Sequence, residues 1–146
     1  MFDYYVTGLK IGHQVPRFDK QALNQGHPED VSLNAWISAG KRVVLVFLET
    51  LSKETPVLDH HAIDGTITVY VSKFSPQTLK ELGVTHGLVV SDEDLTLCES
   101  YGMLQADKTI TPGVVVIEST GACAILYQNA AFKAPSKDAL NALIHA

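Results

Sequence analysis

The sequence of 146 residues lacks the features typical of disulfide-rich, zinc-binding, membrane-spanning and secreted proteins. Its two cysteines, Cys98 and Cys123, are too few for a disulfide framework and show neither a CxxC motif nor zinc-ligand spacing. Its longest strongly apolar runs, 43–48 and 114–117, fall far short of the ~20 residues of a transmembrane helix. The N-terminus lacks the charged and apolar regions of a signal peptide. We therefore expect a cytoplasmic protein with reduced thiols and no membrane contact.

Positive charge is also scarce. Eleven lysines and arginines stand against sixteen aspartates and glutamates, which gives a formal net charge of −5 at pH 7. Because nucleic-acid binding relies on basic side chains that neutralise phosphates, we do not expect a nucleic-acid partner. The fractions of hydrophobic residues (46%) and charged residues (18%) are ordinary for a globular protein, and the length suits one domain over residues 1–146.

Apolar runs that alternate with helix signals predict the order of the elements. Strands are expected at 43–48, 66–72, 87–91, 113–117 and 122–127, and helices at 75–83, at 91–102 and from residue 135 onward. Residues 19–34 are expected to form a polar loop or hairpin, and residues 31–37 a short strand and turn. Helices between strands, then a hairpin and a final helix, predict an α/β sandwich with a mixed central β-sheet flanked by helices and a thioredoxin-like core.

Short motifs in chain order match one family. Residues 9–18 contain G-H-Q-V-P-R-F for the family's G-x-x-A-P-x-F, and residues 40–45 read G-K-R-V-V-L for its G-K-x-V-V-L. Residues 55–58 read T-P-V-L for its T-P-V-C, residues 91–104 contain S-D…E-S-Y-G-M-L for its L-S-D…E-A-Y-G-V-L, and residues 114–121 read V-V-V-I-E-S-T-G for its V-F-V-V-D-x-x-G. Together they span nearly the whole chain, which resembles the peroxiredoxins and, most closely, the bacterial thiol peroxidase branch. The resemblance implies a thioredoxin-like fold and an antioxidant reduction of peroxides that uses thioredoxin as electron donor.

The chain departs from this family where the family carries its chemistry. In peroxiredoxins a cysteine thiolate attacks the peroxide bond, and a helix N-terminus, a Thr hydroxyl and an Arg activate that thiolate. At the matching position this sequence has Leu58, which cannot ionise or be oxidised in this way, although Thr55 and Pro56 remain. No arginine follows Arg42, and Lys108 is the cation nearest in sequence to the family's Arg position.

The surrounding segments are also altered. Only eight residues separate Leu58 from the strand near Ile67, where the family has a longer helix that presents its cysteine. The helix at 76–82 contains no resolving cysteine. The resemblance therefore implies a thiol-peroxidase-like domain without its catalytic cysteines. We expect it to bind thioredoxin, another protein, a second copy of itself or a small ligand at the former active-site turn around Thr55, Pro56 and Leu58.

A relocated thiol, Cys98 or Cys123, is the first alternative and would preserve oxidoreductase activity. Cys98 lies in the middle of a predicted helix with carboxylates nearby, and negative neighbours raise the pKa of a thiol. Cys123 has apolar neighbours. Both are typical of core residues, and the sequence leaves open whether they form a bridge.

A metal or ligand site around His60 is the second alternative. Asp59, His60, His61 and Asp64 form the densest group of ligand-type side chains. On a helix, adjacent histidines point about 100° apart, so only His60 and Asp64 would share a face. A solvated helix face explains the same pattern.

Two further clusters have both a functional and a structural interpretation. The turn from Ser52 to Thr55 could line a binding site with hydroxyls, or Thr55 could be the N-cap of a helix with Pro56 in its first turn. The acids 92–94 could serve acid/base chemistry or cap a helix. The sequence has no dinucleotide, P-loop or nucleophile-elbow motif, so no cofactor is predicted.

Overall fold

The computed structural model describes residues 9–55, 57–128 and 136–144. Its strands are β1 (Asp19–Asn24), β2 (His27–Ser32), β3 (Arg42–Phe47), β4 (Thr66–Ser72), β5 (Leu88–Ser91), β6 (Gly113–Ile117) and β7 (Cys123–Gln128). Its helices are α2 (Leu33–Ser38), α3 (Pro76–Glu81), α4 (Thr96–Ser100) and α5 (Lys137–Ile144). The longest of them, α5, has eight residues, and no helix of the described chain reaches the length and hydropathy of a membrane span.

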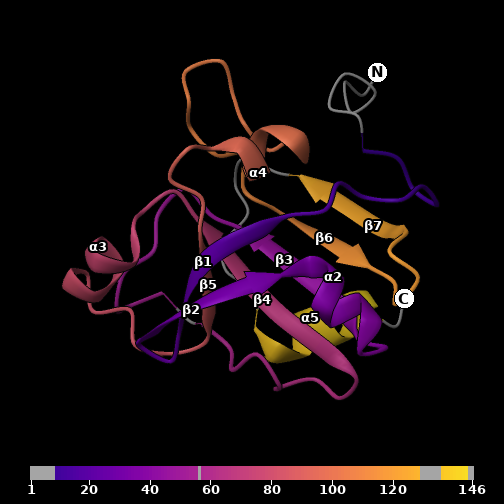
Figure 1. The fold of residues 1–146 in the computed structure, drawn as a ribbon, viewed down its shortest axis with the longest axis horizontal. Coiled ribbons are helices and arrows are strands. Elements are labelled where there is room, and N and C mark those ends of the chain that lie inside the picture. The colour runs from indigo at the N-terminus through magenta and orange to yellow at the C-terminus, as the bar shows by residue number, and fades with distance from the viewer. Residues whose placement is uncertain (1–8, 56, 129–135, 145–146) are drawn as a thin grey trace.

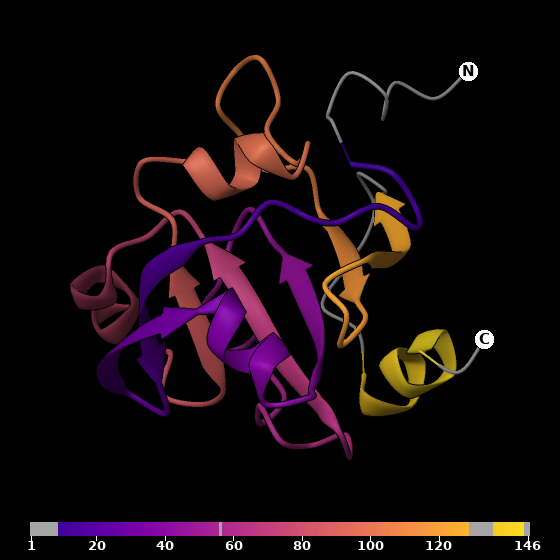
Figure 2. The ribbon, with the colours of Figure 1, turned by 45° about the vertical axis from the view of Figure 1, so that its right-hand side comes forward.

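Seven strands form one mixed sheet in the order β2-β1-β5-β4-β3-β6-β7. Strands β3, β4 and β5 are parallel, whereas β1, β2, β6 and β7 join the sheet by antiparallel pairing. The carboxyl ends of the three parallel strands point toward α4 and the loop that follows it (Figure 2). This arrangement confirms the predicted α/β sandwich with a mixed central sheet.

Each face of the sheet has its own hydrophobic core. Along β3, Val43, Leu45 and Phe47 enter the first core, which also takes side chains of α2 and α4. Val44 and Val46 enter the second core, which takes side chains of α3, α5 and the connection between β3 and β4. Figure 1 shows α2 in front of the sheet and α5 behind it. The apolar run of β3 is therefore buried on both faces, as its lack of polar alternation predicts.

The predicted hairpin forms, but the segment after it differs from expectation. Gln25 and Gly26 both have positive φ angles, 49° and 84°, which suits a two-residue turn between β1 and β2. The strand and turn expected over 31–37 is wrong, because β2 ends at Ser32 and a helix follows. Leu33, Trp36 and Ile37 recur with helical spacing, and all three pack on the first core.

Strand β4 is buried more completely than its alternating pattern suggests. All seven of its residues are buried, because it lies between β3 and β5 with a core on each face. Its polar side chains are therefore enclosed. The Ser72 hydroxyl accepts a hydrogen bond from the Phe74 N–H at 3.0 Å, whereas the Thr68 hydroxyl has no partner among the described residues.

Asp92 caps α4 from inside the protein. It is fully buried after β5, and its carboxylate accepts hydrogen bonds from the N–H groups of Leu97 (3.1 Å) and Cys98 (2.8 Å). Lys20 of β1 lies 2.9 Å from the same carboxylate and 2.7 Å from that of Asp94. Burial alone would lower the pKa of Lys20, but its hydrogen bonds to Asp94 and Asp92 outweigh this effect and raise it. The capping interpretation is confirmed for Asp92 and for Asp94, which accepts the Thr96 N–H at 3.2 Å.

Replacing Asp92 should cost much more stability than replacing its exposed neighbour. Asp92→Ala removes two capping acceptors and the buried partner of Lys20, so we expect the free energy of unfolding to fall by about 3 kcal/mol. Asp94→Ala is the matched control, because Asp94 contacts the same lysine from an exposed position. Urea denaturation of both variants measures the difference, and equal losses would contradict the capping role.

Candidate functional site

The connection between β3 and β4 contains the turn around Thr55 and Leu58, whose sequence resembles the family's active-site turn. Ligands of α/β proteins commonly bind at the carboxyl ends of parallel strands, where this connection begins. Its described residues form turns and bends but no helix, so the helix expected to begin at Thr55 is wrong. The Thr55 hydroxyl instead accepts a hydrogen bond from the Ser52 N–H at 3.1 Å, and the Thr55 N–H donates to the Ser52 carbonyl. Pro56 lies outside the described residues.

Leu58 is held against the sheet by a buried tyrosine. Its backbone N–H donates to the hydroxyl of Tyr70 on β4 at 3.0 Å. Tyr70 is fully buried, and burial raises the pKa of its hydroxyl. The side chains of Val57 and Leu58 pack on the second core. The position that resembles the family's cysteine is therefore a hydrophobic anchor for the connection.

The turn packs closely on the loop between α3 and β5. Gly87 in that loop has φ +74°, and a Cβ there would overlap the Val57 side chain and lie 2.8 Å from the Leu58 carbonyl oxygen. A pocket of ≈ 30 Å³ remains between the two segments, lined by Ser52, Lys53, Thr55, Val57, Gly83, Val84, Thr85 and His86. This volume has room for about two water molecules.

An ion pair that the sequence analysis missed lies at the same edge of the sheet. Glu49 follows β3 and Lys73 follows β4, and their side chains form a half-buried ion pair. The second carboxylate oxygen of Glu49 accepts a hydrogen bond from the Ile110 N–H at 2.5 Å, which ties the loop before β6 to this edge. Lys108 lies exposed in that loop. The sequence signal for this pair is that Glu49 and Lys73 each come shortly after one of two neighbouring parallel strands.

Both thiols lie in surroundings opposite to those that activate cysteine. Cys98 and Cys123 are free, fully buried and part of the first core. Burial, reinforced by the Asp92 carboxylate, raises the pKa of Cys98 well above its ordinary value. Burial likewise raises the pKa of Cys123. Leu58 packs on the second core, so the thiols lie on the opposite face of the sheet from the turn.

The residues around His60 do not form the helix face that the spacing suggested. His60 and Asp64 lie among turns and bends, so the shared helical face is wrong. The rings of His60 and His61 are in contact, with centroids 3.9 Å apart, and Asp59 Oδ1 lies 3.8 Å from His60 Nδ1. A hydrogen bond from the His61 N–H lowers the pKa of Asp59. Across the described ranges, no three ligand-type side chains converge in a way that could hold a metal ion.

Comparison with known proteins finds structures of the same fold but no match in sequence. No family model and no curated protein matches the sequence. Among solved structures, the reduced 2-Cys peroxiredoxin of Plasmodium vivax aligns with a TM-score of 0.76 at 21% identity, covering 92% of this chain and 96% of that one. AhpC of Mycobacterium tuberculosis aligns with a TM-score of 0.76 at 16% identity, covering 94% and 96%. The fold is that of the 2-Cys peroxiredoxins.

The mitochondrial 2-Cys peroxiredoxin of Plasmodium falciparum extends this likeness, with a TM-score of 0.73 at 16% identity over 93% of this chain and 95% of that chain. The peroxiredoxin fold thus confirms the architecture implied by the collinear motifs. The narrower resemblance to the bacterial thiol peroxidase branch stays a prediction, as does the role of each residue in the turn.

The contact between Gly87 and the turn can be tested with a glycine pair. Gly87→Ala and Gly40→Ala both place a side chain at positive φ, 74° and 77°, which costs about 1 kcal/mol at each position. Only at Gly87 would the new Cβ meet Val57 and Leu58, whereas a Cβ at Gly40 has nothing within 4 Å. We therefore expect Gly87→Ala to lower the denaturation midpoint clearly more than Gly40→Ala. Equal midpoints would contradict the close packing of the turn.

Proposed function

We propose that this chain is a peroxiredoxin-fold binding domain that does not reduce peroxides by the thiol mechanism. The observation that carries the proposal is the position of Leu58, whose N–H is bonded to Tyr70 and whose side chain packs on the second core. Thr55 also closes a turn with Ser52 and is not an N-cap. The turn thus offers neither a nucleophile nor a helix N-terminus that could lower the pKa of one.

The buried thiols support the same proposal. Peroxide reduction needs a thiolate that the peroxide can reach, and a thiolate forms readily only where its pKa is lowered. Cys98 and Cys123 are enclosed in the first core, and both have raised pKa values. An enzyme that relocated its thiol to either position would have to open this core in every catalytic cycle.

A protein partner suits the turn better than a small molecule. The pocket beside the turn, at ≈ 30 Å³, is far below the roughly 300–1,000 Å³ of small-molecule sites. Its neighbours Lys53, Glu54 and Asp59 are exposed and charged, which suits a polar protein surface. The proposed partner is therefore a protein, either thioredoxin, another protein or a second copy of this chain.

The intact mass after peroxide treatment tests the absence of thiol chemistry. With a small excess of hydrogen peroxide and a sulfenic-acid trap, we expect the mass of the native, reduced protein to stay unchanged over many minutes, because both thiols are buried with raised pKa values. The control is the same protein in denaturant with an alkylating reagent, where two thiols must react. A sulfenic acid or a disulfide within seconds would contradict the proposal and support a relocated thiol.

Introducing a cysteine into the turn tests the local environment separately. We expect the thiol of Leu58→Cys to titrate near or above the ordinary value of about 8.5, because the turn has neither an arginine nor a helix N-terminus. The pH dependence of its alkylation rate measures this pKa, and a variant that also carries Cys98→Ala and Cys123→Ala isolates the signal. A pKa lowered by two or more would mean that the turn retains an activating environment.

A further inference from the structure

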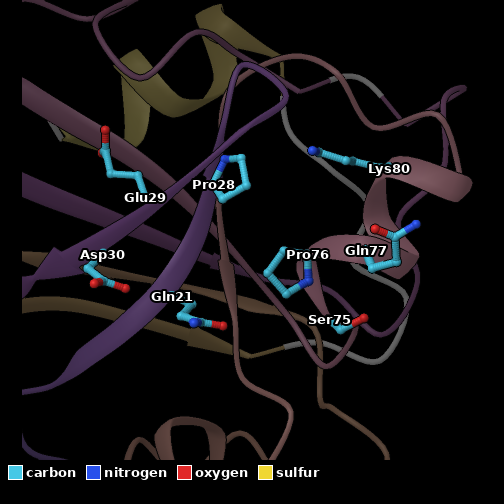
Figure 3. Close-up of a pocket in the computed structure, with 8 residues that line it drawn as sticks. All are labelled: Gln21, Pro28, Glu29, Asp30, Ser75, Pro76, Gln77 and Lys80. Carbon is cyan, nitrogen blue, oxygen red and sulfur yellow. The ribbon is translucent and has the colours of Figure 1, made fainter.

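A groove lies between the β1–β2 hairpin and α3, separate from the former active-site turn. Its volume is ≈ 530 Å³, within the roughly 300–1,000 Å³ that small ligands occupy. It is lined by Gln21, Pro28, Glu29, Asp30, Ser75, Pro76, Gln77 and Lys80 (Figure 3). The turn contacts residues 83–87 beyond the other end of α3, so no residue lines both places.

The register of the hairpin explains how one wall of the groove is built. Gln21 pairs with Asp30, and Leu23 pairs with Pro28. Because side chains alternate along a strand, these four residues point to the same face of the hairpin. On that face Leu23 packs on the second core beside α3. Leu23 is buried there, whereas Gln21, Pro28 and Asp30 are exposed and border the groove.

The facing wall is the first turns of α3. The Ser75 side chain accepts a hydrogen bond from the Thr78 N–H at 3.1 Å, and Pro76 occupies the start of the helix. In Figure 3, Pro76 faces Pro28 across the groove, and Lys80 extends from α3 toward the hairpin. Two proline rings and a capped helix make both walls rigid before any ligand arrives, which lowers the entropic cost of binding.

Charges of opposite sign stand on the two walls. Glu29 and Asp30 belong to the hairpin and Lys80 to α3. Neither Asp30 nor Lys80 forms an ion pair with another described residue, so the groove keeps these charges apart. The groove is also lined by the two prolines, which are apolar, and by Gln21 and Gln77, whose amides can both donate and accept hydrogen bonds.

We propose that this groove binds a short peptide with a free α-ammonium and a free α-carboxylate. The ammonium faces the Asp30 carboxylate of the hairpin, the carboxylate faces Lys80, and the glutamine amides bond the peptide backbone. The proline rings contact the peptide side chain between the ends. A phosphate-bearing ligand suits the groove less well because the Asp30 carboxylate lies on one wall, and a purely cationic ligand would meet Lys80 without a counter-charge.

Titration with trialanine, followed by amide NMR of the full chain, tests this inference. We expect saturable shifts at the amides of Gln21, Asp30 and Gln77. Acetylating the peptide's N-terminus or amidating its C-terminus should each weaken binding about threefold, because exposed ion pairs contribute little and are screened by salt. Absence of saturable shifts, or equal affinity for the free and doubly capped peptides, would overturn the inference.

Charge-removing variants show which wall binds which end. Lys80→Gln should weaken trialanine about threefold and leave the C-amidated peptide unaffected, whereas Asp30→Asn should weaken trialanine and leave the N-acetylated peptide unaffected. Lys137→Gln on α5, an exposed lysine outside the groove, is the matched control and should change neither affinity. Weakening by Lys137→Gln equal to that by Lys80→Gln would overturn the assignment. These results are independent of the thiols, so a peroxide-reactive cysteine would overturn the proposed function and leave this inference intact.

Discussion

The parallel pairing of β3 and β4 is the constraint on which the rest of the structure depends. Two neighbouring parallel strands need a connection that crosses one face of the sheet, and that connection is usually a helix. Here the described residues of the connection, 48–55 and 57–65, form turns and bends, and Leu48, Leu51 and Ile63 bury its apolar side in the second core. Because a helix would satisfy its own backbone, this connection has to find other hydrogen-bond partners.

Tyr70 and Thr68 on β4 supply two of those partners. The Tyr70 hydroxyl accepts the Leu58 N–H, and the Thr68 N–H donates to the His60 carbonyl at 3.1 Å. The absence of a helix from the described part of this connection and the burial of Leu58 against the second core are therefore linked. A thiol at residue 58 would have no helix dipole to stabilise its thiolate, and a leucine fills the second core better than a thiol would.

The sequence predicted the central elements because their signals are local. The apolar runs of β3, β4 and β6 are strands in the structure, and Asp92 and Asp94 bond N–H groups at the start of a helix, as their position indicates. Thr55 misled, because a threonine hydroxyl that can cap a helix can also close a turn, as it does here by accepting the Ser52 N–H. The groove could not be predicted at all, because its walls come from segments about fifty residues apart that only the hairpin register and the placement of α3 bring together.

Helix α3 and the loop after it connect the two surfaces that could bind partners. Ser75, Pro76 and Lys80 line the groove, and a few residues later Gly87 meets Val57 and Leu58 with no room for even a methyl group. Because closely packed atoms cannot be compressed, a movement of the Gly87 loop would be passed on to the residues that it contacts. A ligand that shifted α3 together with this loop would therefore move Leu58 and strain its hydrogen bond to Tyr70. A ligand that left α3 in place would leave the turn unchanged, so the rigidity of α3 decides whether the groove and the turn act independently.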